Sequence, residues 1–280
     1  MSQDILVLGG TGKTGRRVAE RLRARELPVR IGSRSGAPPF DWEDPSTWAP
    51  ALEGASAVYV SFFPDLAVPG APEAIGTLAD EALAAGCRRL VLLSGRGEEE
   101  AQRAERVLAE SGAEWTVLRC SWFMQNFSEG DFAEPVAAGE LALPAGDVRA
   151  PFVDADDIAD VAVAALTEDG HAGRVYELTG PRALTHAEVA EEIGRATGRQ
   201  IRYVDVPLEA FTAALAGEGV PPDVVSLLRY LFSEVLVDGN AHPADGVRRA
   251  LGREPRDFAA FALAAARDGA WDRSPAEAVR

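Results

Sequence analysis

The chain has 280 residues, of which 47% are hydrophobic, enough to bury the core of one large domain or of two smaller ones. Its 44 acidic residues outnumber its 28 basic ones, and the formal net charge of −16 repels phosphate backbones and anionic membranes. The composition therefore argues against direct binding of nucleic acid or of a membrane surface.

The cysteines and histidines show no pattern typical of a metal site. Cys87 and Cys120 lie on apolar segments, and the three histidines lack zinc-binding spacing. The first residues do not resemble a signal peptide, and no run approaches the ~20 apolar residues of a membrane span. We expect two free thiols, no metal, and a cytoplasmic protein that is a monomer or a homodimer.

The first 120 residues alternate short apolar runs with helical patterns. The expected elements in this part are strand 5–8, helix 14–25, strand 29–33, strand 57–63, helix 73–85, strand 89–94, helix 98–110 and strand 115–119. Nearly continuous apolar strands are typical of a parallel sheet that helices cover on both faces. The alternation predicts a Rossmann-type, doubly wound α/β fold.

After residue 120 the pattern becomes looser and then mostly helical. The expected elements are strand 148–153, helix 154–166 with an acidic N-terminus, strand 175–179, helix 185–197, strand 201–206, and helices 207–217, 221–235, 244–251 and 255–267. We predict a nucleotide-binding domain over 1–150, to which strands of 151–180 return. A smaller, mostly helical part follows over 181–280.

The glycine-rich turn after the first strand has two possible interpretations. Gly12-Lys13-Thr14 resembles the end of a Walker A motif, and Lys13 is the only lysine of the chain. That motif requires a glycine five positions before the Gly-Lys pair, where this chain has Val7. The loop is also two residues too short to wrap a β-phosphate, which argues against a kinase or NTPase.

The spacing of Gly9, Gly12 and Gly15 fits the dinucleotide-binding turn better. The first glycine allows a sharp exit from the strand, the second lets the pyrophosphate approach the backbone, and the third lets the helix pack on the sheet. The candidate phosphate-binding residues are Gly9, Thr11, Gly12, Lys13, Thr14 and Gly15. Lys13 is expected to neighbour the pyrophosphate or a 2′-phosphate.

The end of the second strand indicates which dinucleotide is bound. An NAD-specific site usually has an acidic residue there for the ribose 2′-hydroxyl, but no acid precedes Asp41. Ser33 and Arg34 instead offer a hydroxyl and a guanidinium that suit a 2′-phosphate. The sequence therefore favours NADP(H) over NAD(H).

Several segments together resemble the NmrA-like atypical short-chain dehydrogenases, a group that includes NADPH-dependent quinone oxidoreductase-like proteins. The matching segments are 8–15, 41–42 before 51–54, 118–127, 151–159, 178–181 and 251–255. The resemblance covers almost the whole chain. It implies a Rossmann domain and a small C-terminal part that covers the substrate.

The resemblance also implies positions for the rest of the site. To the cofactor site it adds Asp41, Trp42, Phe62, Phe63, Pro64, Ser94, Gly95 and Cys120. To the substrate pocket it assigns Trp122, Phe123, Met124, Asn126 and Phe127. An aromatic and methionine cluster at a strand end is also typical of ordinary core, so both interpretations of the second set stay open.

One feature of short-chain dehydrogenases is missing. Their Tyr-x-x-x-Lys pair passes a proton to the carbonyl oxygen because the lysine lowers the tyrosine pKa. The four tyrosines here are followed four positions later by Phe63, Gly180, Pro207 and Glu234. The catalytic residue is therefore unassigned, with Ser94 as the remaining weak candidate.

Three functions fit these features. The first is an NADPH-dependent oxidoreductase that reduces a small conjugated electrophile such as a quinone, because such an acceptor can take its proton from solvent. The second is a non-enzymatic NADP(H)-binding redox sensor or regulator. The third is an isomerase or epimerase of a biosynthetic intermediate with a tightly held cofactor.

Overall fold

The computed structural model describes residues 4–272, and the chain divides into two compact units. The first unit contains the residues up to Cys120 together with Ala155–Leu178 and Asp245–Glu254. The second contains Ser121–Asp154, Thr179–Ala244 and the residues from Pro255 onward. This division differs from the expected boundary at residue 150, since 121–154 belong to the second unit.

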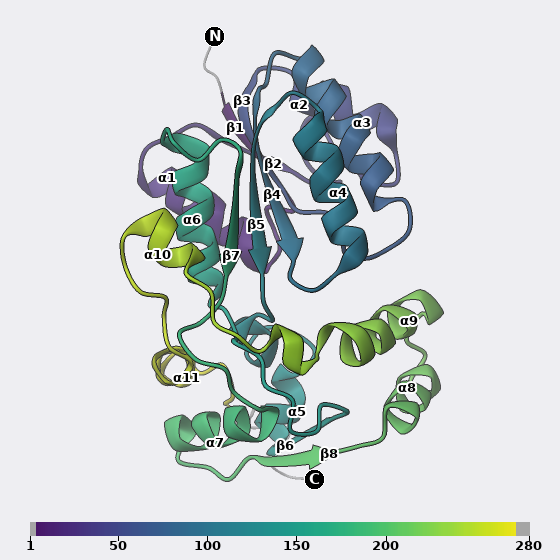
Figure 1. Cartoon of the computed structure of the whole chain (residues 1–280), viewed down its shortest axis with the longest axis vertical. Helices are drawn as coiled ribbons and strands as arrows, with labels where there is room; N and C mark the ends of the chain where they lie inside the picture. Colours follow the sequence, from purple (N-terminus) through teal and green to yellow (C-terminus); the bar gives the residue numbers. More distant parts are fainter. Residues whose placement is uncertain (1–3, 273–280) are drawn as a thin grey trace. The chain divides into compact units, whose positions relative to one another are not determined.

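The first unit is built on a six-stranded sheet in the order β2-β1-β3-β4-β5-β7 (Figure 1). Its strands are β1 (Asp4–Leu8), β2 (Val29–Gly32), β3 (Ala55–Val60), β4 (Arg89–Gly95), β5 (Glu114–Cys120) and β7 (Arg174–Leu178). Every neighbouring pair is parallel. The carboxyl ends of all six strands therefore lie at one edge of the sheet, where nucleotides bind in this class of fold.

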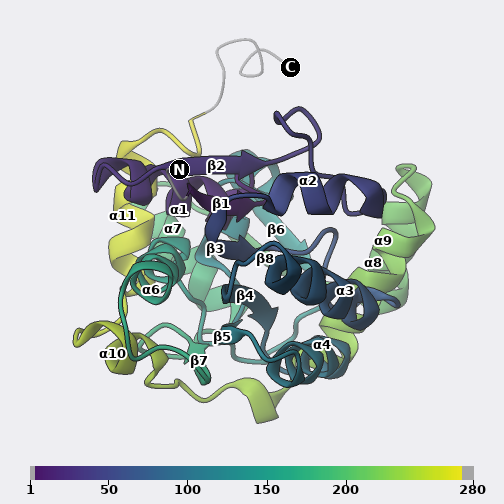
Figure 2. The same cartoon turned by 90° about the horizontal axis from the view of Figure 1, so that it is seen from above.

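Helices cover both faces of this sheet (Figure 2). The helices are α1 (Lys13–Ala24) and α6 (Ala155–Thr167) on one face, and α2 (Trp48–Leu52), α3 (Ala71–Ala84) and α4 (Glu99–Glu110) on the other. The 3₁₀ turn η1 (Pro45–Thr47) precedes α2, and α10 (Gly246–Leu251) packs against α6 and β7. The Rossmann-type α/β fold predicted from the sequence is confirmed.

Burial on both faces explains the apolar strands. Leu6, Val58 and Leu92 belong to the core cluster under α2, α3 and α4. Their strand neighbours point to the opposite face, and residues such as Val7 and Tyr59 are fully buried there. A strand that is buried on both sides has no polar face, which is why these strands read as continuous apolar runs.

The second unit combines helices with a two-stranded parallel sheet, β6-β8. Its elements are η2 (Met124–Phe127), α5 (Ala133–Ala138), β6 (Glu140–Leu143), α7 (His186–Thr197), β8 (Arg202–Asp205), α8 (Leu208–Gly217), α9 (Pro222–Tyr230), η3 (Leu231–Val235), η4 (Asp238–Asn240) and α11 (Phe258–Arg267). Thr185 begins α7 with a capping box, since it accepts from the Glu188 N–H while its own N–H donates to the Glu188 carboxylate. Helices α7 and α11 pack together over an aromatic core.

The structure differs from the expected elements at three places in the second unit. The predicted strand 148–153 is wrong: Ala150 and Val153 form only isolated bridges, because Pro151 has no N–H for a ladder. Strand β6 was not predicted. The predicted helix 221–235 is α-helical only as far as Tyr230, after which Leu231–Val235 form a π-helical turn.

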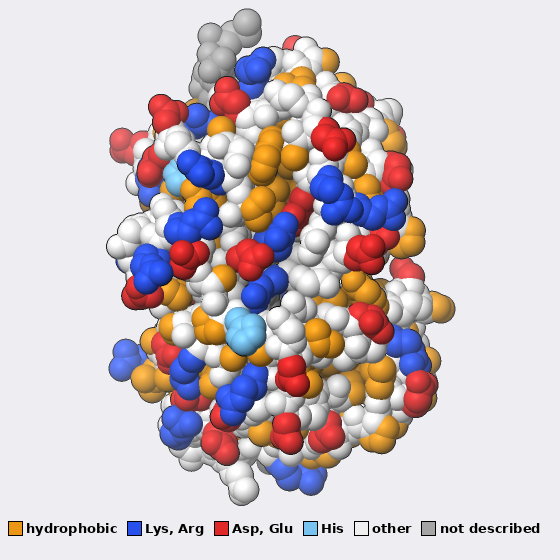
Figure 3. Space-filling view, viewed as in Figure 1, with side chains coloured by type: hydrophobic (Ala, Val, Ile, Leu, Met, Phe, Trp, Pro, Cys, Tyr) orange, Lys and Arg blue, Asp and Glu red, His pale blue; other side chains and the backbone are white. Residues whose placement is uncertain are grey.

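The surface shown in Figure 3 carries acidic and basic side chains that are interspersed with one another. Among residues 4–272, no helix is long and apolar enough to cross a membrane. No group of three or more histidine, cysteine or acidic residues in that range is arranged to hold a metal ion.

Candidate functional site: a dinucleotide cradle at the carboxyl edge of the sheet

The turn between β1 and α1 has the geometry of a phosphate cradle. Gly9 leaves the strand with φ +66°, and its carbonyl oxygen accepts from the Gly12 N–H at 2.9 Å. Gly12 is the N-cap of α1, and no side chain caps the helix. The first N–H groups of a helix lack intrahelical acceptors, so they and the helix dipole favour an anion here.

The close packing of this turn accounts for the glycine at position 15. A Cβ atom on Gly15 would lie 2.3 Å from the backbone oxygen of Gly9 and 2.9 Å from the Cα of Gly10. A Cβ atom on Gly12 would meet only the Gly9 oxygen, at 3.3 Å, so one side of Gly12 is open. The turn is thus closed toward the strand and open where a pyrophosphate would approach, which fits a dinucleotide.

Polar and basic side chains surround this turn. Thr11 is exposed, Lys13 is half-buried, and Thr14 is buried. The Arg17 guanidinium donates to the Lys13 carbonyl oxygen at 2.8 Å and forms an ion pair with Asp156 at 3.3 Å. These contacts fix the first turn of α1, which presents the N–H groups.

The end of β2 presents Ser33 and Arg34 at the same edge of the sheet. Ser33 is half-buried, and its hydroxyl lies 3.4 Å from that of Ser35. Arg34 is exposed, and no ion pair found within residues 4–272 involves it. An exposed guanidinium beside the turn is able to receive a 2′-phosphate.

Asp41 and Trp42 lie on the loop between β2 and β3 and have structural partners. The Asp41 carbonyl oxygen accepts from the indole of Trp48 at 2.6 Å, and the indole of Trp42 donates to the Ser61 carbonyl oxygen at 3.1 Å. The ring of Trp42 also packs on Phe62, with 4.7 Å between the centroids. These contacts hold the loop against the end of β3.

The residues after β3 differ strongly in exposure. Phe62 is half-buried against Trp42, whereas Phe63 is 71% exposed and Pro64 is exposed. A phenylalanine exposed to that degree at the carboxyl edge of the sheet offers an apolar surface to a planar group. The placement is compatible with the role that the family resemblance implies for Phe63.

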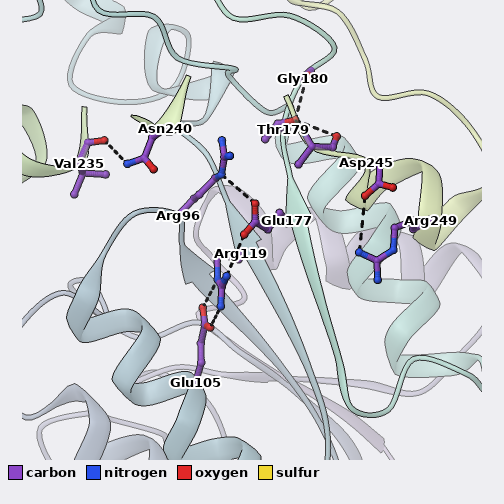
Figure 4. Close-up of polar contacts among 11 residues, drawn as sticks. Arg96, Glu105, Arg119, Glu177, Thr179, Gly180, Val235, Asn240, Asp245 and Arg249 are labelled. Atoms are coloured by element: carbon purple, nitrogen blue, oxygen red, sulfur yellow. Dashed lines mark hydrogen bonds and ion pairs between the residues drawn. The ribbon is translucent and has the colours of Figure 1, made fainter. Parts of the chain in front are cut away.

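A charged network of Arg96, Glu105, Arg119 and Glu177 lies at the ends of β4, β5 and β7 (Figure 4). Ser94, the candidate catalytic residue, belongs to this network. Its buried hydroxyl donates to the Glu105 carboxylate at 2.6 Å. Arg119 donates to the same carboxylate and to Glu177 at 3.1 Å, and Arg96 donates to Glu177 at 3.2 Å. In the structure Ser94 is therefore a hydrogen-bond donor to Glu105, a residue of α4.

Glu98 is a buried carboxyl group that the sequence analysis did not single out. Its side chain folds over Gly95, where a Cβ atom would lie 2.0 Å from Oε1. The pKa of Glu98 is raised well above its ordinary value, mainly because the side chain is buried and also because the carboxylate of Asp65 lies nearby. Asp65 hydrogen bonds to Glu98 and accepts from the Ala67 N–H at 2.8 Å.

We expect Glu98→Gln to remove part of the pH dependence of stability. Because the folded pKa is raised, the folded state holds this proton more tightly than the unfolded chain, so the stabilisation is present below about pH 4.5 and is lost as the pH rises toward the folded pKa. Each pKa unit corresponds to about 1.4 kcal/mol. Urea unfolding at pH 5 and pH 8 measures the effect: the variant should gain stability relative to wild type at the higher pH.

The neighbouring Glu99→Gln change is the matched control for this experiment. Glu99 is exposed, so the same loss of charge should leave the difference between the two pH values close to that of wild type. If Glu98→Gln and Glu99→Gln behave alike, the burial of Glu98 does not have the energetic effect described here.

Cys120 ends β5 with a fully enclosed thiol. Burial raises the pKa of Cys120 well above its ordinary value, so the thiol stays protonated at neutral pH. Its carbonyl oxygen accepts from the Arg96 N–H at 2.9 Å. Cys87 is buried as well, and both cysteines are free, as the sequence predicts.

The five residues assigned to the substrate pocket fall in the second unit and differ in exposure. Met124 and Phe127 are fully buried in its core, whereas Trp122, Phe123 and Asn126 are half-buried. The Phe127 carbonyl oxygen accepts from the indole of Trp271 at 2.7 Å. Met124 and Phe127 thus have core roles in this structure.

Two buried polar groups near these residues were missed by the sequence analysis. Gln125 donates to the Asp154 carboxylate at 2.8 Å, and both side chains are buried. His186 is the first residue of α7, and neither of its ring nitrogens has a hydrogen-bond partner among residues 4–272. Neither follows a spacing motif, so only burial in the folded chain distinguishes them.

Comparisons with known proteins identify the family of this chain. The profile of the NAD(P)H-binding family matches residues 9–169, more than half of the chain, and the chain belongs to this family. Proteins of this family bind nicotinamide dinucleotides. This chain is an oxidoreductase of the family. The resemblance to the NmrA-like atypical short-chain dehydrogenases is confirmed.

Individual relatives match over nearly the whole chain. The uncharacterized oxidoreductase YesF of Bacillus subtilis is 36% identical over 271 residues, which are 93% of this chain and 94% of that protein. The NAD(P)H azoreductase of Xenophilus azovorans is 33% identical over 282 residues, or 93% and 97% of the two chains. Among solved structures, the NADPH-dependent quinone oxidoreductase of Escherichia coli has the same fold, with a TM-score of 0.76, 24% identity and coverage of 92% and 98%.

Proposed function

We propose that this protein is an NADPH-dependent reductase of small conjugated electrophiles such as quinones and azo compounds. The dinucleotide cradle and Arg34 support the choice of cofactor. The relatives named as azoreductase and quinone oxidoreductase support the substrate class. The bound cofactor supplies a hydride, and the protein binds and orients the two reactants.

One observation carries the restriction to conjugated acceptors: neither tyrosine of the first unit is placed to donate a proton. Burial raises the pKa of Tyr59, which lies within β3. The hydroxyl of Tyr176 is buried and lies 2.9 Å from Nδ1 of His171. An unactivated ketone needs a proton donor at its oxygen, whereas a quinone or an azo group delocalises the charge and takes its proton from water.

Turnover with a panel of acceptors tests this proposal. The purified protein should oxidise NADPH in the presence of a naphthoquinone, an azo dye or an enone, and should not do so with cyclohexanone. Tight NADPH binding without oxidation by any acceptor would contradict the proposal and would favour a redox sensor. Equal rates with cyclohexanone would contradict the restriction to conjugated acceptors.

Arg34→Ala is expected to weaken the selectivity for NADPH. The variant loses a charge-assisted hydrogen bond to the 2′-phosphate, worth about 1.5–3 kcal/mol, so the KM for NADPH should rise by roughly 10- to 100-fold. The KM for NADH should stay within about twofold, since NADH has no phosphate at this position. Steady-state kinetics with both cofactors measure the change.

Arg23→Ala is the matched control for Arg34→Ala. Arg23 is an exposed arginine in the last turn of α1, at the end of the helix opposite to the cradle, so the same change in net charge should leave both KM values unaltered. If the KM for NADPH rises equally in the two variants, Arg34 does not recognise the 2′-phosphate.

A further inference from the structure

Tyr59 is a buried tyrosine of β3 whose hydroxyl group has no partner among residues 4–272. Its side chain is 0% exposed, and the hydroxyl oxygen forms no hydrogen bond with any residue of that range. Buried polar groups in folded proteins are nearly always paired. Phenylalanine would fill the same space without leaving a polar atom unpaired, so the presence of the hydroxyl group requires an explanation.

Tyr59 lies on the part of β3 that adjoins the glycine-rich turn of the first unit. In the parallel pair of β1 and β3, Tyr59 is the partner of Val7, which precedes Gly9 by two residues. Two residues after Tyr59, the Cβ atom of Ser61 lies only 3.1 Å from the position that a Cβ atom on Gly9 would take. The end of β3 is therefore packed against the turn from which α1 begins.

Thr14 brings a second hydroxyl group to the phenol of Tyr59. Thr14 lies in the first turn of α1, directly after Lys13, and is 4% exposed. Its side chain interacts with the phenol and lowers the pKa of Tyr59, although burial has the larger effect and raises that pKa overall. The two groups are thus neighbours, but they do not have the geometry of a hydrogen bond in this structure.

The protons of the two hydroxyl groups suit a chain of hydrogen bonds that ends on an anion. Burial keeps the phenol protonated at neutral pH, so Tyr59 remains a donor. The thiol of Cys120, its other titratable neighbour, is directed to the Leu118 carbonyl oxygen at 3.4 Å. A threonine hydroxyl has one proton and two lone pairs, so Thr14 can accept from the phenol and still donate to a phosphate oxygen.

We propose that Tyr59 is a positioning residue of the dinucleotide cradle: its hydroxyl group donates to the Thr14 hydroxyl, which then donates to a phosphate oxygen of the bound dinucleotide. No proton is transferred, and the hydrogen bonds only fix the direction in which Thr14 donates. Linked hydrogen bonds of this kind polarise one another and become stronger. The inference rests on the cofactor of the proposed function and not on its acceptor, so binding alone tests it.

Calorimetric titration with ADP-ribose tests this role without turnover. ADP-ribose carries the pyrophosphate but neither the nicotinamide nor the 2′-phosphate. Tyr59→Phe should raise the Kd for ADP-ribose by roughly 3- to 10-fold, while its Tm stays at or above that of wild type because an unpaired polar group is removed. The Kd for 2′-AMP, which lacks the pyrophosphate, should not change. An unchanged Kd for ADP-ribose would overturn the inference, and so would an equal weakening of 2′-AMP binding.

Tyr176→Phe is the matched control, because Tyr176 is the other buried tyrosine of the first unit. Its hydroxyl group is paired with Nδ1 of His171 at 2.9 Å. This variant loses a formed hydrogen bond, so its Tm should fall while its Kd for ADP-ribose stays at the wild-type value. Equal weakening of ADP-ribose binding in the two variants would show that the effect of Tyr59→Phe is structural.

A double-mutant cycle tests whether Tyr59 acts through Thr14. Thr14→Val removes the hydroxyl group but keeps the shape of the side chain, and in this background Tyr59→Phe should not weaken ADP-ribose binding further. In the Thr14→Ser background, which keeps a hydroxyl group, Tyr59→Phe should retain its effect. Additive effects of Tyr59→Phe and Thr14→Val would overturn the inference. A wild-type protein that binds ADP-ribose but reduces no acceptor would overturn only the proposed function.

Discussion

Replacing Gly15 with alanine is expected to abolish dinucleotide binding. The added Cβ atom would lie 2.3 Å from the backbone oxygen of Gly9, closer than real Cβ contacts allow. The start of α1 must therefore move away from the turn, which misplaces the N–H groups that form the cradle. Fluorescence titration with NADPH should show a loss of affinity of about 100-fold or more, together with a lower Tm.

Gly12→Ala distinguishes a lost cradle from a lost fold. At this position the new methyl group meets only the Gly9 oxygen, at 3.3 Å, and otherwise points to the open side of the turn. The variant should keep a Tm within a few degrees of wild type but bind NADPH at least about 10-fold more weakly. Unchanged NADPH affinity in this variant would show that the pyrophosphate does not approach Gly12.

Removing the carboxylate of Asp157 is expected to cause the largest loss of stability. Asp157 lies in the first turn of α6 with an exposure of 0%, and it pairs with Arg253 at 2.7 Å. Arg253 also pairs with Asp160 and thereby ties the segment Asp245–Glu254 to α6 within the first unit. Asp157→Ala removes the buried carboxylate from a guanidinium that is 37% exposed and keeps Asp160 as a partner, so the expected loss is that of one charged hydrogen bond, about 1.5–3 kcal/mol.

Urea unfolding measures this loss, and Glu168→Ala provides the matched control. Glu168 follows the last residue of α6, with a side chain 58% exposed, and it pairs at 3.6 Å with Arg25, which is itself 50% exposed. Ion pairs of that kind contribute about 0–1 kcal/mol, so the control should unfold close to wild type. A similar small effect of both substitutions would contradict the structural role assigned to Asp157.

Much of the first unit could be predicted from the sequence because its signals are local. The glycine spacing of 9, 12 and 15 lies between an apolar run and an amphipathic helix, and together they define β1 and α1. The strands of this unit are buried on both faces, so their apolar runs stand out from the helices between them. Once the strands and helices are known to alternate, the sheet must be parallel, and the carboxyl ends of its strands lie at the same edge of the sheet.

The errors concern features that long-range contacts decide. Strand β6 has the sequence Glu-Leu-Ala-Leu, whose residues favour helices, and it becomes a strand by pairing with β8, about sixty residues later in the chain. The segment Asp245–Glu254 returns to the first unit through the packing of α10 against α6 and β7 and the ion pairs of Arg253. No local pattern marks such pairings.

In the candidate site, too, the sequence indicates the features that follow a local pattern and misses those that depend on tertiary contacts. The residues predicted to form the cradle follow a spacing rule that is visible in the sequence. Ser94 was a candidate because the family resemblance places it in the cofactor site, but its hydroxyl is bonded to Glu105, eleven positions along the chain. Glu98 and His186 acquire unusual chemistry only through burial, which depends on tertiary packing.

The most direct test of the account is a single-turnover experiment with the protein loaded with NADPH. Rapid mixing with a naphthoquinone under anaerobic conditions should remove the nicotinamide absorbance and produce one hydroquinone for each NADPH consumed. The same mixing with the protein loaded with NADH should require much higher cofactor concentrations. Stable absorbance of protein-bound NADPH after mixing with excess naphthoquinone would contradict the central claim.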